Sequence, residues 1–112
     1  MIVEEPLRST SAFVRRPGTM ANGKPFSTEV IEAVWCKALP VALNGVFRKD
    51  ACGAIMSRMQ YGQPDSFGWV IDHIKPVASG GTDDLDNLQP LHWENNLHKG
   101  DDYPHWACKR RI

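Results

Sequence analysis

Neither sign of charge dominates this sequence. Thirteen Lys and Arg residues are balanced by thirteen Asp and Glu residues, so the formal net charge at pH 7 is zero. Proteins that bind nucleic acid through bulk charge carry a clear basic excess, and this balance argues against that class. Any nucleic-acid surface must therefore be local. Basic residues gather in three short clusters, Arg15-Arg16, Arg48-Lys49 and Lys109-Arg110-Arg111.

Long apolar runs are absent as well. No stretch approaches the roughly 20 apolar residues that a membrane-spanning helix needs. The first residues, MIVEEPLRSTSAFVRRPG, include acidic residues and a proline where a signal peptide has its apolar stretch. We therefore expect a cytoplasmic protein with no membrane partner.

Cysteine pairs with metal-binding spacing are also missing. The chain has three cysteines, Cys36, Cys52 and Cys108. An odd number without any CxxC pair indicates neither a disulfide framework nor a four-cysteine zinc site. We interpret all three as buried free thiols.

The length and composition are typical of one soluble domain. The 112 residues are 42% hydrophobic and 23% charged. Residues 1–26 contain several prolines and glycines with little periodicity, which predicts an extended or partly disordered arm outside the core. The single folded domain is then expected at residues 27–112.

The first part of this domain predicts one helix. Ser27 is suited to cap a helix that begins at Thr28, carries apolar residues at helical spacing and stops at Pro40. Residues 41–50 are expected to form a loop. The periodicity of residues 52–61 leaves a strand and a short helix open, and we favour the strand.

The second part predicts a strand, a loop, a second strand and a helix. Aromatic and β-branched residues mark the first strand at 67–74, and glycines with acidic residues mark the loop at 78–86. The second strand is expected at 87–91. A helix follows at 91–99, and Gly100 is suited to end it.

Four polar residues of this second part are candidates for chemistry. Asp72 and Asn96 offer the oxygen ligands that a hard divalent cation prefers. His73, with an unperturbed pKa of about 6.5, can accept a proton from water near neutral pH. Asn87 is expected to hydrogen-bond to backbone across the loop and so fix the His73 ring. The set predicts phosphodiester hydrolysis assisted by one metal ion.

Three further residues flank this set. Lys75 and Lys99 are predicted to contact phosphate groups of a nucleic acid. His92 lies one helical turn before Asn96, and we interpret it as a structural residue rather than a metal ligand.

Three linked blocks carry these residues, IDHIKP at 71–76, GGTDDLDNLQ at 80–89 and NNLHKGD at 95–101. Their order and spacing resemble the signature of the HNH endonucleases. The resemblance implies an α+β fold with a ββα-metal core motif at 67–101, to which the first helix and a flexible N-terminal arm are added. It also implies metal-dependent cleavage of DNA, with His73 as general base, Asn87 as loop organiser, and Asp72 with Asn96 as metal ligands.

The chain departs from the family pattern at two points. Many members bind a structural zinc through cysteine pairs, but His92 and Asn95 occupy the positions of the second pair. We therefore expect no structural zinc, and apolar residues such as Trp69, Leu91 and Trp93 are expected to brace the site. The last signature residue is Asn rather than His, as in an H-N-N branch, which favours Mg²⁺ or Mn²⁺ over Ni²⁺ or Zn²⁺.

Two functions stay open at the level of sequence. One is a DNA endonuclease that acts in phage packaging beside a terminase, in restriction, or as a toxin with an immunity protein. The other is a catalytically inactive nucleic-acid-binding module of the same fold, against which the intact set of Asp72, His73, Asn87 and Asn96 counts. The sequence predicts no oligomeric state.

Overall fold

The computed structural model describes residues 14–41 and 45–112, and these form a mixed arrangement of two α-helices and two small antiparallel sheets. The helices are α2 (Thr28–Trp35) and α3 (Trp93–Lys99). One sheet has the order β1 (Leu39–Pro40), β2 (Phe47–Lys49) and β3 (Ile55–Ser57), and the other pairs β4 (Trp69–His73) with β5 (Leu88–His92). Three 3₁₀ turns complete the elements, at Arg58–Gln60, Val77–Ser79 and Leu85–Asn87.

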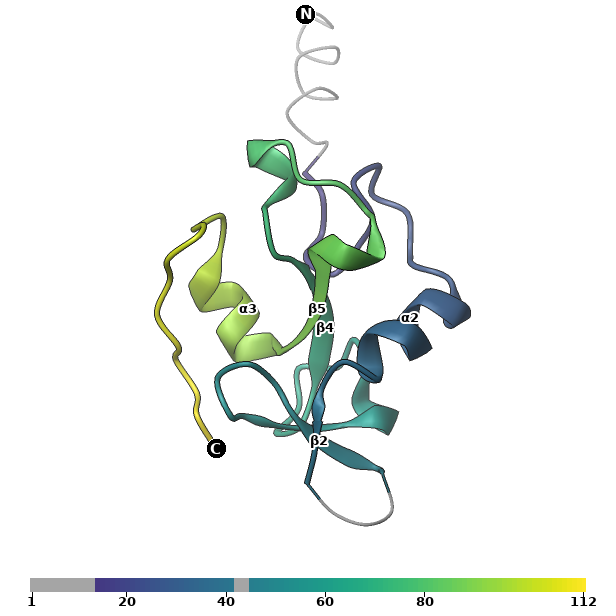
Figure 1. The fold of residues 1–112 in the computed structure, drawn as a ribbon, viewed down its shortest axis with the longest axis vertical. Helices are drawn as coiled ribbons and strands as arrows, with labels where there is room; N and C mark the ends of the chain where they lie inside the picture. Colours follow the sequence, from purple (N-terminus) through teal and green to yellow (C-terminus); the bar gives the residue numbers. More distant parts are fainter. Residues whose placement is uncertain (1–13, 42–44) are drawn as a thin grey trace, which may run out of the picture.

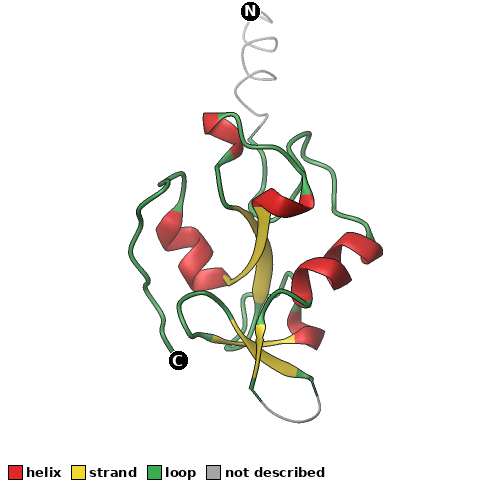
Figure 2. Cartoon of the chain, in the orientation of Figure 1, coloured by secondary structure: helices red, strands yellow, loops and turns green. Residues whose placement is uncertain are grey.

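The β4–β5 ribbon stands between the two helices, with α2 on one side and α3 on the other (Figures 1 and 2). Its register pairs Trp69 with His92 and Asp72 with Gln89, so the end of β4 lies beside the start of β5. This mixed architecture agrees with the predicted α+β class and is compatible with an HNH-type fold. Among the described residues, no helix is long and apolar enough to cross a membrane.

Helix α2 begins where the sequence predicts and ends earlier. The Ser27 hydroxyl accepts a hydrogen bond from the Val30 backbone N–H, so Ser27 is the N-cap. The predicted continuation to Pro40 is wrong, because Leu39 and Pro40 leave the helix to pair with β2. Strand pairing here overrides the local helical pattern.

The segment between α2 and β4 differs from the prediction in one part and agrees in another. Residues 47–49 of the expected loop form the central strand β2, while residues 42–44 lie outside the described residues. The ambiguous stretch 52–61 contains the favoured strand, β3, followed directly by a 3₁₀ turn.

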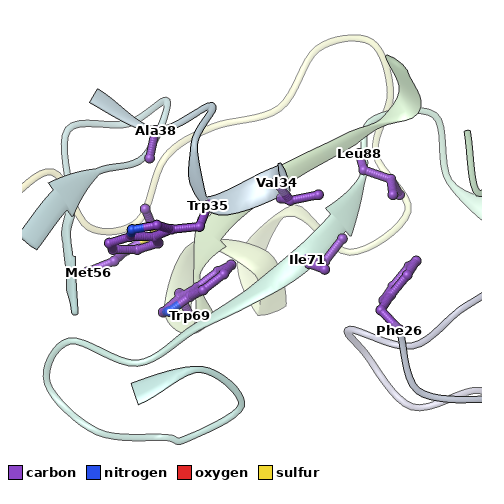
Figure 3. Packing of buried hydrophobic residues seen from close by; sticks show 8 residues of the cluster. All are labelled: Phe26, Val34, Trp35, Ala38, Met56, Trp69, Ile71 and Leu88. Atoms are coloured by element: carbon purple, nitrogen blue, oxygen red, sulfur yellow. The ribbon is translucent and has the colours of Figure 1, made fainter. Parts of the chain in front are cut away.

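Side chains from α2, the ribbon, β3 and the segments on either side of α2 form the core (Figure 3). Trp35 and Trp69 pack with ring centroids 5.0 Å apart at one end of this cluster. Phe26 packs at the other end with 6% of its surface exposed, so the prediction that residues 1–26 stay outside the core is wrong for Phe26. Gly18 also lies against β4, since a Cβ there would come within 3.1 Å of Val70 Cβ. Residues 1–13 lie outside the described residues.

The cysteines differ from the prediction. Cys52 and Cys108 form a disulfide across 56 residues, and Cys36 is a free thiol but exposed. The interpretation of all three as buried free thiols is therefore wrong. Pairing depends on the distance between Cα atoms in the fold, which spacing along the chain does not determine.

A buried carboxylate organises the region beside this disulfide. Asp50 is 4% exposed and accepts four hydrogen bonds. Its Oδ1 accepts from the backbone N–H groups of Cys52 and Ala54, and its Oδ2 accepts from the His92 N–H and from Asn95 Nδ2. The turn after β2 is thereby joined to the start of α3.

Asn95 extends the same network to the C-terminal segment. Its Oδ1 accepts from the backbone N–H groups of Lys109 and Arg110, and its Nδ2 donates to the Arg110 carbonyl. Trp69 and Leu91 are fully buried nearby in the ribbon, as expected. Polar contacts of His92 and Asn95 and the Cys52–Cys108 disulfide thus join the apolar residues in this region.

Replacing Asp50 with alanine is expected to destabilise the protein by about 3 kcal/mol or more, since several buried N–H donors lose their acceptor at about 1–3 kcal/mol each. The measurement is the free energy of unfolding from urea titration. Asp86→Ala, an exposed acidic residue, serves as control and should stay within about 0.5 kcal/mol of wild type. An equally small loss for Asp50→Ala would contradict this role of the network.

Candidate active site

Strand β4 brings two adjacent polar residues to the site at its end. Asp72 and His73 are 6% and 4% exposed. Asp72 Oδ2 accepts a hydrogen bond of 2.9 Å from Gln89 Nε2 on β5 and lies 3.3 Å from Lys99 Nζ on α3. Burial raises the pKa of the Asp72 carboxyl, and the Gln89 hydrogen bond and the Lys99 charge oppose that rise.

The His73 ring is held by side chains from outside the ribbon. Its Nε2 lies 2.8 Å from Oδ1 of Asp83, in the loop between β4 and β5. The Phe26 ring packs against it with centroids 5.9 Å apart. The sequence interpretation did not single out Asp83, although its place in an acidic loop after a double glycine was visible.

Asn87 closes the loop between β4 and β5. Its Oδ1 accepts from the Lys75 backbone N–H, and its Nδ2 donates to the carbonyls of Lys75 and Thr82. A Cβ at Gly81 would lie 1.7 Å from the Lys75 carbonyl oxygen, so this closure requires glycine there. The backbone contacts expected of Asn87 are therefore present, and its effect on the His73 ring stays a prediction.

One pocket brings the end of β4 and helix α3 together. Asp72, His73 and Asn96 line it, together with Asp101 just after α3. Arg15, from the segment that the sequence placed outside the domain, lines the same pocket and is held by a hydrogen bond from Nη1 to the Thr19 carbonyl. The sequence assigned neither Arg15 nor Asp101 to the pocket. Arg15 reaches it by a contact across the fold, whereas Asp101 is the last residue of the third sequence block.

The side chain of Lys99 is buried in the protein. Its side chain is 1% exposed, and its Nζ donates to the His73 carbonyl oxygen at 3.1 Å in addition to pairing with Asp72. The prediction that Lys99 contacts phosphate is therefore wrong. The side chain links α3 to both residues at the end of β4. Lys75 is exposed, and its phosphate contact stays a prediction.

His92 agrees with its structural interpretation. Its Nδ1 accepts a hydrogen bond from the Glu94 backbone N–H at the start of α3, so Nε2 carries the ring proton. That Nε2 lies 2.7 Å from the Ser66 carbonyl, which it reaches as donor. With both ring nitrogens engaged and no exposed surface, His92 has no lone pair left for a metal.

The pocket offers oxygen donors rather than a cage of His and Cys. In residues 14–41 and 45–112, no group of three or more His, Cys, Asp and Glu is placed to hold a metal. The contacts to Asp72 from described residues reach Oδ2, which leaves Oδ1 for another ligand, and Asn96 adds an amide oxygen in the same pocket. Two oxygen donors fit a hard divalent cation that keeps water and substrate as further ligands.

Comparison with known families agrees with this placement. Residues 62–102 match the family model described as HNH endonuclease. The match spans β4, β5 and α3, and it confirms the resemblance to the HNH family over these residues. It indicates nuclease-type activity in general. Comparisons with curated proteins and with solved structures found no match.

Lys99→Met should cost about 3–5 kcal/mol in the free energy of unfolding, because it leaves the buried Asp72 carboxylate without its cation. Combining it with Asp72→Asn should cost less than the sum of the two single changes, since the pair is then removed together. Urea titration measures both. Lys75→Met is the matched control at an exposed lysine, and a Lys99→Met protein as stable as that control would refute the buried ion pair.

Proposed function

We propose that this protein is a metal-dependent endonuclease that hydrolyses phosphodiester bonds in DNA, with β4, β5 and α3 as a ββα-metal unit. The observation that carries the proposal is the convergence of Asp72, His73 and Asn96 on one pocket inside the segment that matches the HNH family. Each residue type suits one part of the reaction.

In the proposed site, Asp72 and Asn96 hold one divalent cation, with Mg²⁺ or Mn²⁺ favoured over Ni²⁺ or Zn²⁺ because the donors are oxygens. When bound, the cation supplies Lewis-acid stabilisation of the phosphate and of the departing oxygen. His73 takes a proton from the attacking water as general base. Asn87 keeps the loop closed behind that histidine, and Lys75 contacts a flanking phosphate.

The alternative is a DNA-binding module of the same fold that does not cut. Its pocket would bind metal and DNA, so only a cleavage assay separates the two. Association with a terminase or an immunity protein follows from the family resemblance alone and stays a prediction.

Purified protein incubated with supercoiled plasmid is expected to nick it with Mg²⁺ or Mn²⁺, and EDTA should abolish the nicking. His73→Ala should remove about 10²–10⁴-fold of the rate, the usual contribution of a general base, while DNA binding is kept. Gel electrophoresis of the plasmid measures the nicking by the wild type and by His73→Ala. Full activity in His73→Ala would refute the base, and no cleavage with Mg²⁺, Mn²⁺, Ni²⁺ or Zn²⁺ would favour the binding module.

Metal affinity is expected to depend on the two proposed ligands. Asp72→Ala and Asn96→Ala should each weaken Mn²⁺ binding by about tenfold or more in calorimetric titration, since each removes one of two protein donors. Asn96 is only partly buried, so its variant tests the site without disturbing the Lys99 pair. Asp102→Ala, an exposed carboxylate after α3, is the control. Unchanged binding in Asn96→Ala would exclude it as a ligand.

A further inference from the structure

Asp83 has no part in the proposed metal site or in the loop closure made by Asn87, yet its carboxylate makes two contacts of its own. Its Oδ1 lies 2.8 Å from His73 Nε2, and the His73 side chain is 3% exposed against 28% for Asp83. Both carboxylate oxygens also accept from the Ala21 backbone N–H, at 2.9 and 3.2 Å. Asp83 thus connects the N-terminal segment, residues 14–26, to the end of β4. This segment runs beside the β4–β5 loop in Figure 1.

This contact decides which ring nitrogen of His73 carries the proton. An ionised carboxylate only accepts hydrogen bonds, so the neutral imidazole must present a protonated Nε2 to Asp83. The lone pair then lies on Nδ1, the ring nitrogen left to accept a proton from water.

We propose that Asp83 is a positioning residue for the nuclease reaction: it fixes the His73 ring with Nε2 protonated, which leaves Nδ1 to accept the water proton. In the step it supports, the water proton moves to Nδ1 as the water oxygen bonds to phosphorus. The bond from phosphorus to the leaving oxygen breaks, that oxygen takes a proton from solvent, and Nδ1 later returns its proton to solvent. The effect on rate rests on the proposed function, whereas the contact itself does not.

A purely structural role for Asp83 is the competing explanation, because it also anchors the N-terminal segment. A variant in the anchored turn separates the two roles. Met20 and Gly23 close this turn through a 2.8 Å hydrogen bond from the Gly23 N–H to the Met20 carbonyl, with Ala21 second and Asn22 third. The side chain of Asn22 is exposed, and its Oδ1 accepts a hydrogen bond of 2.9 Å from the Lys24 backbone N–H. Asn22→Ala therefore weakens the turn and removes neither contact of Asp83.

The first test compares kcat and KM for plasmid nicking. Asp83→Asn keeps an acceptor oxygen but loses the charge, and Asp83→Ala loses both contacts. Each is expected to lower kcat by about 10–100-fold with little change in KM, as for other groups that orient a functional histidine. Asn22→Ala is expected to keep the wild-type kcat. Wild-type kcat in both Asp83 variants, or an equal loss in Asn22→Ala, would overturn the proposal.

The second test needs no cleavage and no metal. Nitrogen-15 NMR of the His73 ring should show the proton on Nε2 in the wild type and in Asn22→Ala, in slow exchange with water. Asp83→Ala should exchange that proton faster. A ring proton on Nδ1 in the wild type would contradict the proposed hydrogen bond from His73 to Asp83. An unchanged rate of proton exchange in Asp83→Ala would contradict it as well. If no metal supports nicking by the wild type, the proposed function fails while this measurement still decides whether Asp83 fixes the ring.

Discussion

The buried ammonium of Lys99 is the interaction on which the geometry of the site depends. It reaches the Asp72 carboxylate and the His73 carbonyl oxygen from the last residue of α3. A buried charge of this kind costs several kcal/mol of desolvation unless charged and polar partners surround it, so its position is narrowly defined. Because Asn96 lies on the same short helix, fixing Lys99 against β4 also fixes Asn96 relative to Asp72.

The inner face of α3 shows why this helix depends on polar contacts. Its buried residues are Asn95 and Lys99, four residues apart and hence on one face, whereas Leu97 is 61% exposed. Asn95 is held by Asp50 and by the C-terminal segment, and Lys99 is held by Asp72. Each end of the helix is thus tied to a buried carboxylate. Such buried hydrogen-bonded networks define one arrangement more sharply than apolar packing alone.

Local signals predicted the parts of the fold that depend on neighbouring residues. Ser27 is recognisable as a helix cap, the aromatic and β-branched run at 67–74 as a strand, and Gly100 as a helix end. The structure has all three, with the strand at Trp69–His73. The sequence blocks also indicate three of the residues that line the pocket, namely Asp72, His73 and Asn96.

Contacts between distant segments account for what the sequence could not predict. Leu39 lies in a strand because it pairs with β2. Cys52 forms a disulfide with Cys108 because the fold brings the C-terminal segment beside it. Lys99 has the charge and the terminal helix position of a surface residue, and only the fold reveals its buried partners.

Asp83 belongs to a loop with three aspartates, and the sequence alone does not distinguish one of them from the others. The loop closure made by Asn87 and Gly81 leaves Asp83, and not Asp84 or Asp86, within reach of the histidine. The position of the proposed base is therefore visible in a motif, whereas the group proposed to orient it is set by how the loop closes.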